Sequence, residues 1–417
     1  MKGRISTADV VIIGGGIAGA SIAYQLSRRG QRVLVLERDR LGSGSTGRAA
    51  GLLGQLRSTE AATRMMMESL QIVSEIEERL GVKIFYKTGG LRLATTAERA
   101  QETRDHVAFG RSLGLDMRCV GHDELRKLIP HMRLDDVLEA SYCPSDGHLM
   151  PSELHEAFVQ LAREEGAEFR VHSPVEEMIV EGGRIAGVRC HGEVIECPVA
   201  VNASGPWSYL VANQVEATLP TCAIGHYYIT TVPDERFPID PMSPAVRDYD
   251  NRIYSRPEVG GLLVGIYEAE PREYEMEALP PDFDMSAMFV QRDNLTVATL
   301  MEAAIHRYPF LENELDFHVT HGIMTFTPNG NPFCGEIPGA EGLFHCAGFC
   351  GHGIVRSPAM GAIIADLILE GKARYDMEQL RADRYYDLPE YKTRAEINAK
   401  GRRSYAGHYG KKDPTIN

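Results

Sequence analysis

The sequence predicts an α/β fold with two domains, in which a parallel sheet is joined to a second, mixed or antiparallel sheet. Three observations lead to this fold class. An apolar strand enters a glycine turn at residues 9–19, short strands alternate with turns at residues 168–201, and a second strand–glycine–helix unit occupies residues 342–370. With 417 residues, the chain is longer than one simple hydrophobic core normally serves.

The first strand–glycine–helix unit has the spacing of a dinucleotide site. Residues 10–13 are Val-Val-Ile-Ile, as in a buried parallel strand, and Gly14, Gly16 and Gly19 fit G-x-G-x-x-G. The first glycine allows the tight turn, the second lets a pyrophosphate approach the backbone, and the third lets the helix over residues 17–29 pack closely on the strand. The N–H groups that begin this helix point at the phosphates.

An acidic residue completes this unit. Glu37 ends the strand predicted over residues 32–36, where a carboxylate holds the hydroxyls of a ribose. An acid at this place disfavours a 2′-phosphate and therefore favours FAD or NAD over NADP.

Composition excludes several classes of protein. Charged residues make up 24% of the chain and the formal net charge is −14, which argues against a nucleic-acid surface. No segment approaches the ~18 apolar residues of a membrane helix, and residues 1–8 are too short and polar for an export signal. The 8 cysteines form no CxxC pair and no zinc-like set, so we expect a reduced, cytoplasmic protein with no metal site.

Further elements follow from periodicity and turn residues. Small residues dominate residues 42–54, which predicts a wall for a bound cofactor. Residues 87–90 predict a hairpin turn, Asp123 is a candidate helix cap, and the basic segment from Lys392 predicts a surface arm. The predicted helices cover residues 59–80, 97–113, 151–165 and 283–307, with a last helix ending near residue 370. The predicted strands cover residues 84–86, 91–94, 169–171, 175–180, 185–190, 194–201 and 315–320.

These features together favour FAD. An NAD dehydrogenase does not need the small-residue wall, the Ala203-Ser204-Gly205 strand end and the late glycine turn together, whereas a long ligand that crosses the sheet does. The last helix would aim its positive end at the flavin and favour the reduced state. The residues predicted to bind FAD are Gly14, Gly16, Ile17, Ala18, Gly19, Glu37, Arg38, Ser45, Thr46, Arg48, Ala49, Ala50, Gly51, Leu52, Val175, Ala203, Ser204, Gly205, Trp207, Gly322, Gly348, Gly351, His352, Gly353, Ile354 and Val355.

The motifs resemble those of FAD-dependent amine oxidoreductases of the D-amino-acid-oxidase type, especially the sarcosine and dimethylglycine oxidase or dehydrogenase branch. The matching segments are residues 14–19, 44–48, 202–207, 252–257, 322–332 and 348–353. The resemblance implies a glutathione-reductase-like Rossmann FAD-binding domain and an α+β substrate domain built on a mixed or antiparallel sheet. We assign residues 1–83, 145–217 and 321–375 to the first, 84–144 and 218–320 to the second, and 376–417 to a C-terminal arm.

The same resemblance implies oxidation of the C–N bond of a small secondary or tertiary (N-methyl) amino acid. A hydride passes to flavin N5, the imine hydrolyses, and oxygen, a quinone or an electron-transfer flavoprotein takes the electrons. Two alternatives stay open: a D-amino-acid or glycine-type oxidative deaminase, and a flavoprotein subunit of a multi-subunit amine oxidase. A homo-oligomer or a partner subunit is compatible with each of them.

Three residues are candidates for the reaction itself. Comparison with dimethylglycine-oxidising relatives points to His226 and Tyr254, and Arg256 could clamp a carboxylate with two hydrogen bonds. A neutral imidazole could take the proton that the substrate amine must lose. Covalent relatives attach FAD through a histidine or a cysteine at places where this chain has Arg48 and Gly322, so we expect non-covalent FAD.

Overall fold

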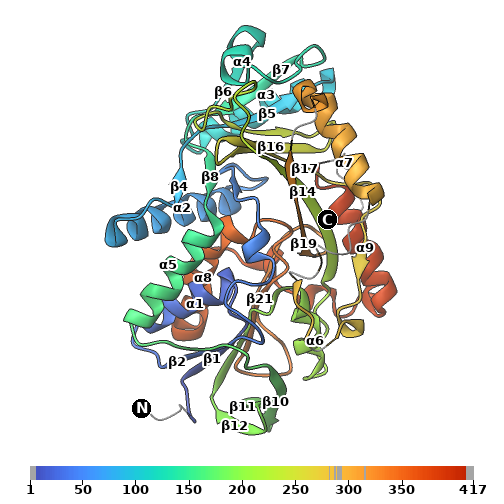
Figure 1. The fold of residues 1–417 in the computed structure, drawn as a ribbon. Coiled ribbons are helices and arrows are strands. Elements are labelled where there is room, and N and C mark those ends of the chain that lie inside the picture. The colour runs from blue at the N-terminus through green and yellow to red at the C-terminus, as the bar shows by residue number, and fades with distance from the viewer. Residues whose placement is uncertain (1–5, 281, 286–287, 289–293, 314–315, 410–417) are drawn as a thin grey trace.

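A computed structural model describes residues 6–280, 282–285, 288, 294–313 and 316–409 (Figure 1). The fold is a mixed α/β fold, and one of its large sheets has six strands in the order β20-β21-β13-β1-β2-β9. Its neighbours run parallel, except for the antiparallel pair β20 and β21. The bounds are β1 (Val10–Ile13), β2 (Val33–Leu36), β9 (Glu168–Arg170), β13 (Val199–Asn202), β20 (Phe333–Glu336) and β21 (Leu343–Ala347).

Helices cover this sheet and bury its apolar strands. The helices concerned are α1 (Ile17–Ser27), α2 (Glu60–Leu80), α5 (Pro151–Glu164) and α8 (Gly353–Glu370) (Figure 1). Helices α1 and α8 pack closely, because a Cβ at Gly361 would lie 2.2 Å from Ser21 Oγ. The Ser21 hydroxyl also donates to the Ser357 carbonyl at 2.8 Å. The first and last helical units of the chain are thereby side by side on one sheet.

A three-stranded antiparallel sheet projects from this region, formed by β10 (Val175–Glu181), β11 (Arg184–Cys190) and β12 (Glu193–Glu196) (Figure 1). The single strand expected over residues 194–201 is in fact two strands, β12 and β13. Cys197 and Pro198 separate them, since proline has no N–H to donate to a ladder.

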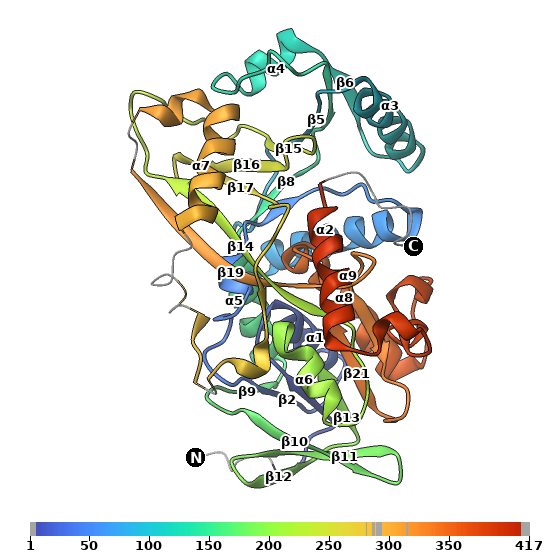
Figure 2. The same ribbon diagram turned by 90° about the vertical axis from the view of Figure 1, so that its right-hand side faces the viewer.

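The second large sheet has nine strands, in the order β18-β14-β17-β16-β15-β5-β7-β6, with β19 paired to β14. The long strands β14 and β19 pair antiparallel from Cys222 with Phe326 to Thr231 with Phe317. Helix α7 (Asn294–Arg307) packs Leu300 and Ala304 into the core of this sheet (Figure 2). The bounds are β5 (Gly90–Ala94), β6 (Arg118–Val120), β7 (Glu139–Cys143), β14 (Cys222–Thr231), β15 (Ala245–Asp248), β16 (Ile253–Glu258), β17 (Gly261–Ile266), β18 (Glu273–Tyr274) and β19 (Phe317–Phe326).

The division of the chain into two domains stays a prediction. Strand β19 runs across one predicted limit, at residue 320. Parts of the helix expected over residues 283–307, and the first residue of the strand expected over 315–320, lie outside the described residues.

The expected hairpin at residues 84–94 is wrong. Strand β4 (Phe85–Tyr86) pairs with β8 (Gly147–Leu149), which also pairs with β3 (Leu52–Leu53), whereas β5 joins the nine-stranded sheet. The chain passes from one sheet to the other at Gly89, whose φ is +89°.

Two smaller helices lie on the nine-stranded sheet's side of the molecule, α3 (Ala97–Ser112) and α4 (His122–Leu128) (Figure 2). Helix α3 begins after Thr96, whose side chain accepts a hydrogen bond from the Arg99 N–H. The cap of α4 is Gly121, and the expected cap Asp123 lies inside the first turn.

The C-terminal segment is packed rather than a surface arm. Helix α9 (Arg394–Ala406) buries Ile397, Gly401 and Tyr405, and a Cβ at Gly401 would lie 2.3 Å from Cys222 Cβ on β14. The many basic residues of this segment suggested an exposed arm, although Ile397, Gly401 and Tyr405 are spaced as one face of a helix. Lys411 and Lys412, also assigned to that arm, lie outside the described residues.

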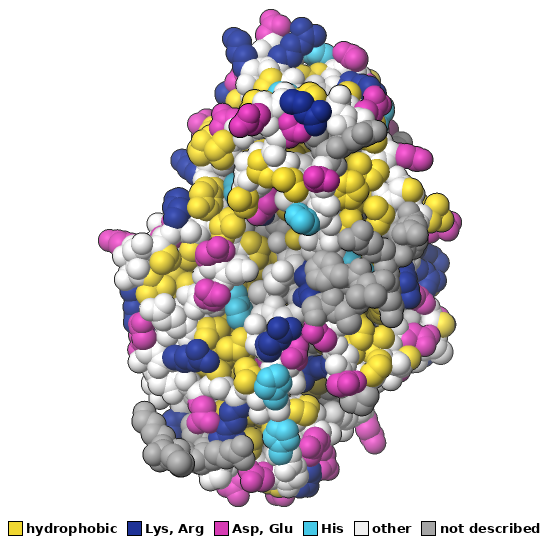
Figure 3. Space-filling model, in the orientation of Figure 1, with side chains coloured by type: hydrophobic (Ala, Val, Ile, Leu, Met, Phe, Trp, Pro, Cys, Tyr) yellow, Lys and Arg dark blue, Asp and Glu magenta, His cyan; other side chains and the backbone are white. Residues whose placement is uncertain are grey.

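The surface carries charges of both signs. Acidic and basic side chains are interspersed over the face drawn in Figure 3. In the described part of the chain, no helix has the length and apolar character needed to cross a bilayer.

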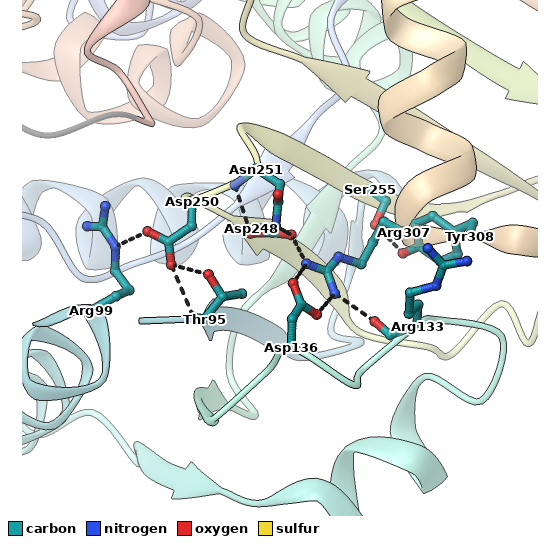
Figure 4. Close-up of polar contacts among 10 residues, drawn as sticks. All are labelled: Thr95, Arg99, Arg133, Asp136, Asp248, Asp250, Asn251, Ser255, Arg307 and Tyr308. Atoms are coloured by element: carbon teal, nitrogen blue, oxygen red, sulfur yellow. Dashed lines mark hydrogen bonds and ion pairs between the residues drawn. The ribbon is translucent and has the colours of Figure 1, made fainter. Parts of the chain in front are cut away.

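A buried ionic network fixes the end of β15 (Figure 4). Arg307, at the end of α7, is fully buried and forms ion pairs with Asp248 at 2.6 Å and Asp136 at 2.8 Å. Asp250 accepts hydrogen bonds from the Thr95 hydroxyl at 2.9 Å and Arg99 Nε at 3.2 Å. Helix α7 and β5 are thereby tied to the turn that follows β15.

We expect Arg307→Met to destabilise the protein by about 3–5 kcal/mol, because it leaves the buried Asp248 carboxylate without its counter-charge. Urea unfolding measures the change. The control Arg64→Met removes an exposed pair with Glu60 and should cost less than about 0.5 kcal/mol. Equal losses in the two variants would contradict the account of the network.

Candidate active site

A cavity of about 440 Å³ is lined by residues of both large sheets. The turn after β1 and the turn before α8 lie on its wall, together with the residues around η1 (Thr46–Arg48). Strands β14 and β16 contribute His226, Tyr228 and Tyr254. Residues from both ends of the chain therefore enclose one space.

The turn after β1 needs its glycines for sterical reasons. Gly14 has φ +108°, and a Cβ there would lie 2.6 Å from the Ala203 carbonyl oxygen. A Cβ at Gly19 would lie 2.0 Å from the Gly14 carbonyl oxygen. Helix α1 therefore lies directly against the strand end, and its N-cap residue Gly16 has no side chain to cap it. The positive end of the helix suits a phosphate group.

Glu37 lines the cavity where β2 ends. One of its carboxylate oxygens accepts from the Gly15 N–H at 2.7 Å, and the other accepts from the Asp39 N–H at 2.8 Å. Burial raises the pKa of this carboxyl, against the effect of the two N–H groups. The backbone thereby fixes the side chain that we expect to meet a ribose.

The second helix that begins at the cavity is α8, which also has no side-chain cap. Its N-cap is His352, whose Nδ1 lies 2.9 Å from the Cys350 carbonyl oxygen. Across the cavity wall, Ser45 donates to the Ile323 carbonyl at 2.5 Å, and the Ile17 N–H donates to Thr46 Oγ1 at 3.0 Å. Two helix N-termini and a wall of small residues fit a long dinucleotide with an anionic middle and a redox ring.

The structure gathers the residues predicted to bind FAD. All of them line the cavity except Gly19 and Val355, which pack α1 and α8 beside it. Several other lining residues were not predicted. They are Arg247 and Met324 from the nine-stranded sheet, and His408 and Tyr409 after α9. The aromatic and imidazole residues near the C-terminus were a signal for the last two.

His226 is hydrogen-bonded at both ring nitrogens. Nε2 lies 2.7 Å from the Tyr254 hydroxyl, and Nδ1 lies 2.7 Å from the Tyr405 hydroxyl of α9. Tyr405 in turn donates to the half-buried Glu268 carboxylate. Burial, with a smaller effect of His408 and His321, lowers the pKa of His226 to about 3, so its imidazole is neutral at pH 7.

Arg256 is not brought into the cavity. Its Nε donates to the Ala50 carbonyl at 2.6 Å, and its guanidinium forms an ion pair with Glu258. The side chain is buried behind the small-residue wall and braces it. Arg247, on the neighbouring strand β15, is the arginine of this sheet that lines the cavity.

In the described ranges, no group of three or more His, Cys, Asp or Glu residues is arranged to hold a metal ion. Of the 8 cysteines, Cys119 is exposed and the others are buried.

Comparison with known proteins agrees with this geometry. A family model described as "FAD dependent oxidoreductase" (DAO) matches residues 9–367. Human mitochondrial sarcosine dehydrogenase is 31% identical over 97% of this chain and 44% of its own length. Rat mitochondrial dimethylglycine dehydrogenase is 28% identical over 95% of this chain and 47% of its own length. The chain thus spans less than half the length of these two relatives.

A solved structure extends the comparison to the fold. L-proline dehydrogenase from P. horikoshii is 27% identical, with a TM-score of 0.82, and the match covers 92% of this chain and 98% of that one. Fold and site define an α/β protein that binds a dinucleotide cofactor. The match over most of its length shows that the chain belongs to the FAD-dependent oxidoreductase (DAO) family, and FAD is its cofactor.

We expect Gly19→Ala to purify with little bound FAD, because the added Cβ would collide with the Gly14 carbonyl and push α1 away from the turn. The ratio of flavin to protein absorbance measures this loss. Gly121→Ala, where a Cβ meets nothing within 4 Å, is the matched control. Full flavin content in Gly19→Ala would refute the role of this close approach.

Buried histidines should make the protein sensitive to acid. Burial is the first cause that lowers the pKa of His106, His148, His226 and His408 to about 3, whereas the unfolded chain takes up these protons below about pH 6.5. Their contribution is thus complete above pH 6.5 and falls toward pH 3, by about 1 kcal/mol per histidine and pH unit.

Thermal unfolding of the FAD-loaded protein between pH 7 and pH 5 measures this slope. His148→Gln should make it shallower, whereas replacing the exposed His318 should leave it unchanged. An unfolding temperature that does not vary over this range would exclude the effect.

Proposed function

We propose that the protein oxidises the C–N bond of a small secondary or tertiary (N-methyl) amino acid. The observation that carries this proposal is the neutral His226, hydrogen-bonded to Tyr254 in the cavity wall. The similarity to sarcosine, dimethylglycine and L-proline dehydrogenases supports it, because the substrates in these three names are amino acids with a substituted nitrogen. When bound, FAD supplies the acceptor for a hydride from the carbon beside that nitrogen.

We also propose a residue assignment for the cofactor. The six-stranded sheet would be a glutathione-reductase-like Rossmann domain, with the ADP half of FAD at the turn after β1, the start of α1 and Glu37. The flavin would lie along residues 45–52, near the N-terminus of α8. The positive end of α8 there favours negative charge, and hence the reduced state. We propose that FAD is held without a covalent bond.

The amine must be neutral before it loses a hydride, and an alkylammonium group has a pKa of about 10, as lysine does. A group in the cavity wall therefore has to take a proton. The hydroxyl of Tyr254 on β16 and the imidazole of His226 on β14 are two polar groups that line the cavity, and they are hydrogen-bonded to each other. Because the imidazole is neutral at pH 7, it is ready to pass a proton on.

The direction of the hydrogen bonds supports this role. Tyr405 donates its proton to Glu268, so its oxygen accepts one from His226 Nδ1–H. Nε2 is then the acceptor nitrogen, and Tyr254 donates to it. Tyr254 keeps a lone pair for an N–H of the substrate. The chain Tyr254, His226, Tyr405 and Glu268 is thus oriented to move a proton from the cavity toward solvent.

Anaerobic mixing of the FAD-loaded protein with N-methyl derivatives of neutral and acidic amino acids tests the proposal. We expect bleaching of the flavin absorbance and formaldehyde in proportion to it, with free FAD in the supernatant after acid precipitation. Ammonia and a 2-oxo acid without formaldehyde would instead favour a deaminase. Absence of bleaching with the whole panel would refute the function.

We expect Tyr405→Phe to slow bleaching by about 10²-fold, because it cuts the path from His226 to Glu268. The loss should shrink as the pH approaches the pKa of the free amine, which then binds already neutral. A purely structural role would lower the flavin content without this pH dependence.

Tyr209→Phe is the matched control, because it removes another buried tyrosine–glutamate hydrogen bond, to Glu277. It should keep the wild-type rate. Equal pH profiles for Tyr405→Phe and the wild type would contradict the proton path.

A further inference from the structure

Three arginines from distant parts of the chain act on one part of the cavity wall. Arg57 follows the small-residue wall, Arg247 lies on β15, and Arg356 lies in the first turn of α8. Arg247 lines the cavity beside His408 and Tyr409, and the charges of all three arginines act on the ring of His352 in the cavity wall. Arg247 is thus in the wall itself, and the charges of Arg57 and Arg356 reach the wall from behind it.

None of the three forms an ion pair with a carboxylate of the described residues. The Nε of Arg57 is buried without a hydrogen-bond partner, and its terminal nitrogen meets only Met66 Sδ, at 3.8 Å. Arg247 lies over the backbone of Gly54, where a Cβ would be 3.5 Å from the guanidinium. A buried charge without a counter-charge is costly, so such a group calls for an anion.

The neighbouring carboxylates are engaged elsewhere. Asp248 and Asp250 follow Arg247 directly, but they pair with Arg307 and Arg99 (Figure 4). Asp146 is the carboxylate whose charge acts on both Arg57 and Arg247. It accepts hydrogen bonds from the backbone and side chain of Gln55, at 3.0 and 3.2 Å. Burial raises the pKa of Asp146 above its ordinary value.

The ionisable groups around the arginines respond to this excess of positive charge. Burial, followed by the charges of Arg356 and Arg247, lowers the pKa of Arg57 to about 9. Burial would raise the pKa of the Tyr249 hydroxyl, yet the surrounding arginines lower it. The region is therefore electropositive while the cavity holds no ligand anion.

We propose that this cluster binds two anionic groups of one substrate, so that the substrate is an N-substituted amino acid with a second carboxylate. The inference rests on the proposed function for its amine and deepens it. The three guanidinium groups carry three positive charges and the buried Asp146 carries one negative charge, which leaves an excess of two positive charges. A single α-carboxylate would balance half of that excess, and a dicarboxylate balances it fully. Arg57, Arg247 and Arg356 are specificity-determining residues in this scheme.

Matched substrate pairs test the proposal, because they differ in charge but hardly in size. We compare anaerobic bleaching by racemic N-methylglutamate with N-methylglutamine, and N-methylaspartate with N-methylasparagine. We expect the dianion of each pair to be preferred by at least about tenfold in bleaching rate over concentration, the value of one further charge-assisted contact. Equal efficiencies, or a preference for the amides, would overturn the proposal.

A second measurement does not depend on turnover. Calorimetry on the FAD-loaded protein compares the binding of glutarate with that of butyrate. Glutarate should bind at least about tenfold more tightly, with an advantage that shrinks as salt is added. If no N-methyl amino acid bleaches the flavin but glutarate still binds preferentially, the proposed function fails and the anion site stands. If N-methyl amino acids bleach the flavin but dianions are not preferred, the proposed function stands and the anion site fails.

Variants assign the effect to the cluster. Arg57→Gln should remove most of the preference for glutarate over butyrate and for N-methylglutamate over N-methylglutamine. The control Arg118→Gln replaces an arginine of β6 whose partner is Glu124, and should keep the wild-type preference. Flavin content checks that each variant is folded. A wild-type preference in folded Arg57→Gln and Arg247→Gln would refute the assignment.

Discussion

The two hydrogen bonds of the His226 ring are the interaction on which the site depends. A buried imidazole can be satisfied at both nitrogens only if one partner donates and the other accepts. Tyr254 of β16 and Tyr405 of α9 fill these places, and Glu268 sets the direction in which the protons point. Through this one ring the C-terminal helix α9 is tied to the cavity wall, although Tyr405 lies 179 residues after His226 in the sequence.

Two different sets of contacts position the opposite walls of the cavity. Glycines at the turn after β1 bring α1 against the strand end, and Gly361 brings α8 against α1. Both helices therefore begin at the cavity. On the facing side, Arg307 ties α7 to the end of β15 and so fixes the strand that carries Arg247. The strand that carries Arg247 and the helices at the cofactor wall are thus held in place by different contacts.

Much of the nucleotide end could be predicted from the sequence, since the glycine spacing, the apolar strand and Glu37 depend on local backbone needs. The pair His226 and Tyr254 was also predicted, by resemblance. The prediction that Arg256 binds the substrate carboxylate was not met by the geometry. Arg256 lies on β16, but its contacts with Ala50 and Glu258 turn it away from the cavity. Tyr405 was missed because its partner lies far away in the sequence, and the basic residues around it suggested an exposed segment.

In the proposed proton path, a neutral His226 that is protonated at Nδ1 passes the amine proton to Tyr405 and Glu268. Nitrogen NMR of the FAD-loaded protein labelled with ¹⁵N-histidine tests it most directly, with His226→Gln to assign the signal. The account predicts one ring with a protonated Nδ1 and a bare Nε2, unchanged between pH 5.5 and 9, because burial lowers its pKa to about 3. A ring that titrates near pH 6.5, or that carries its proton on Nε2, would contradict the account.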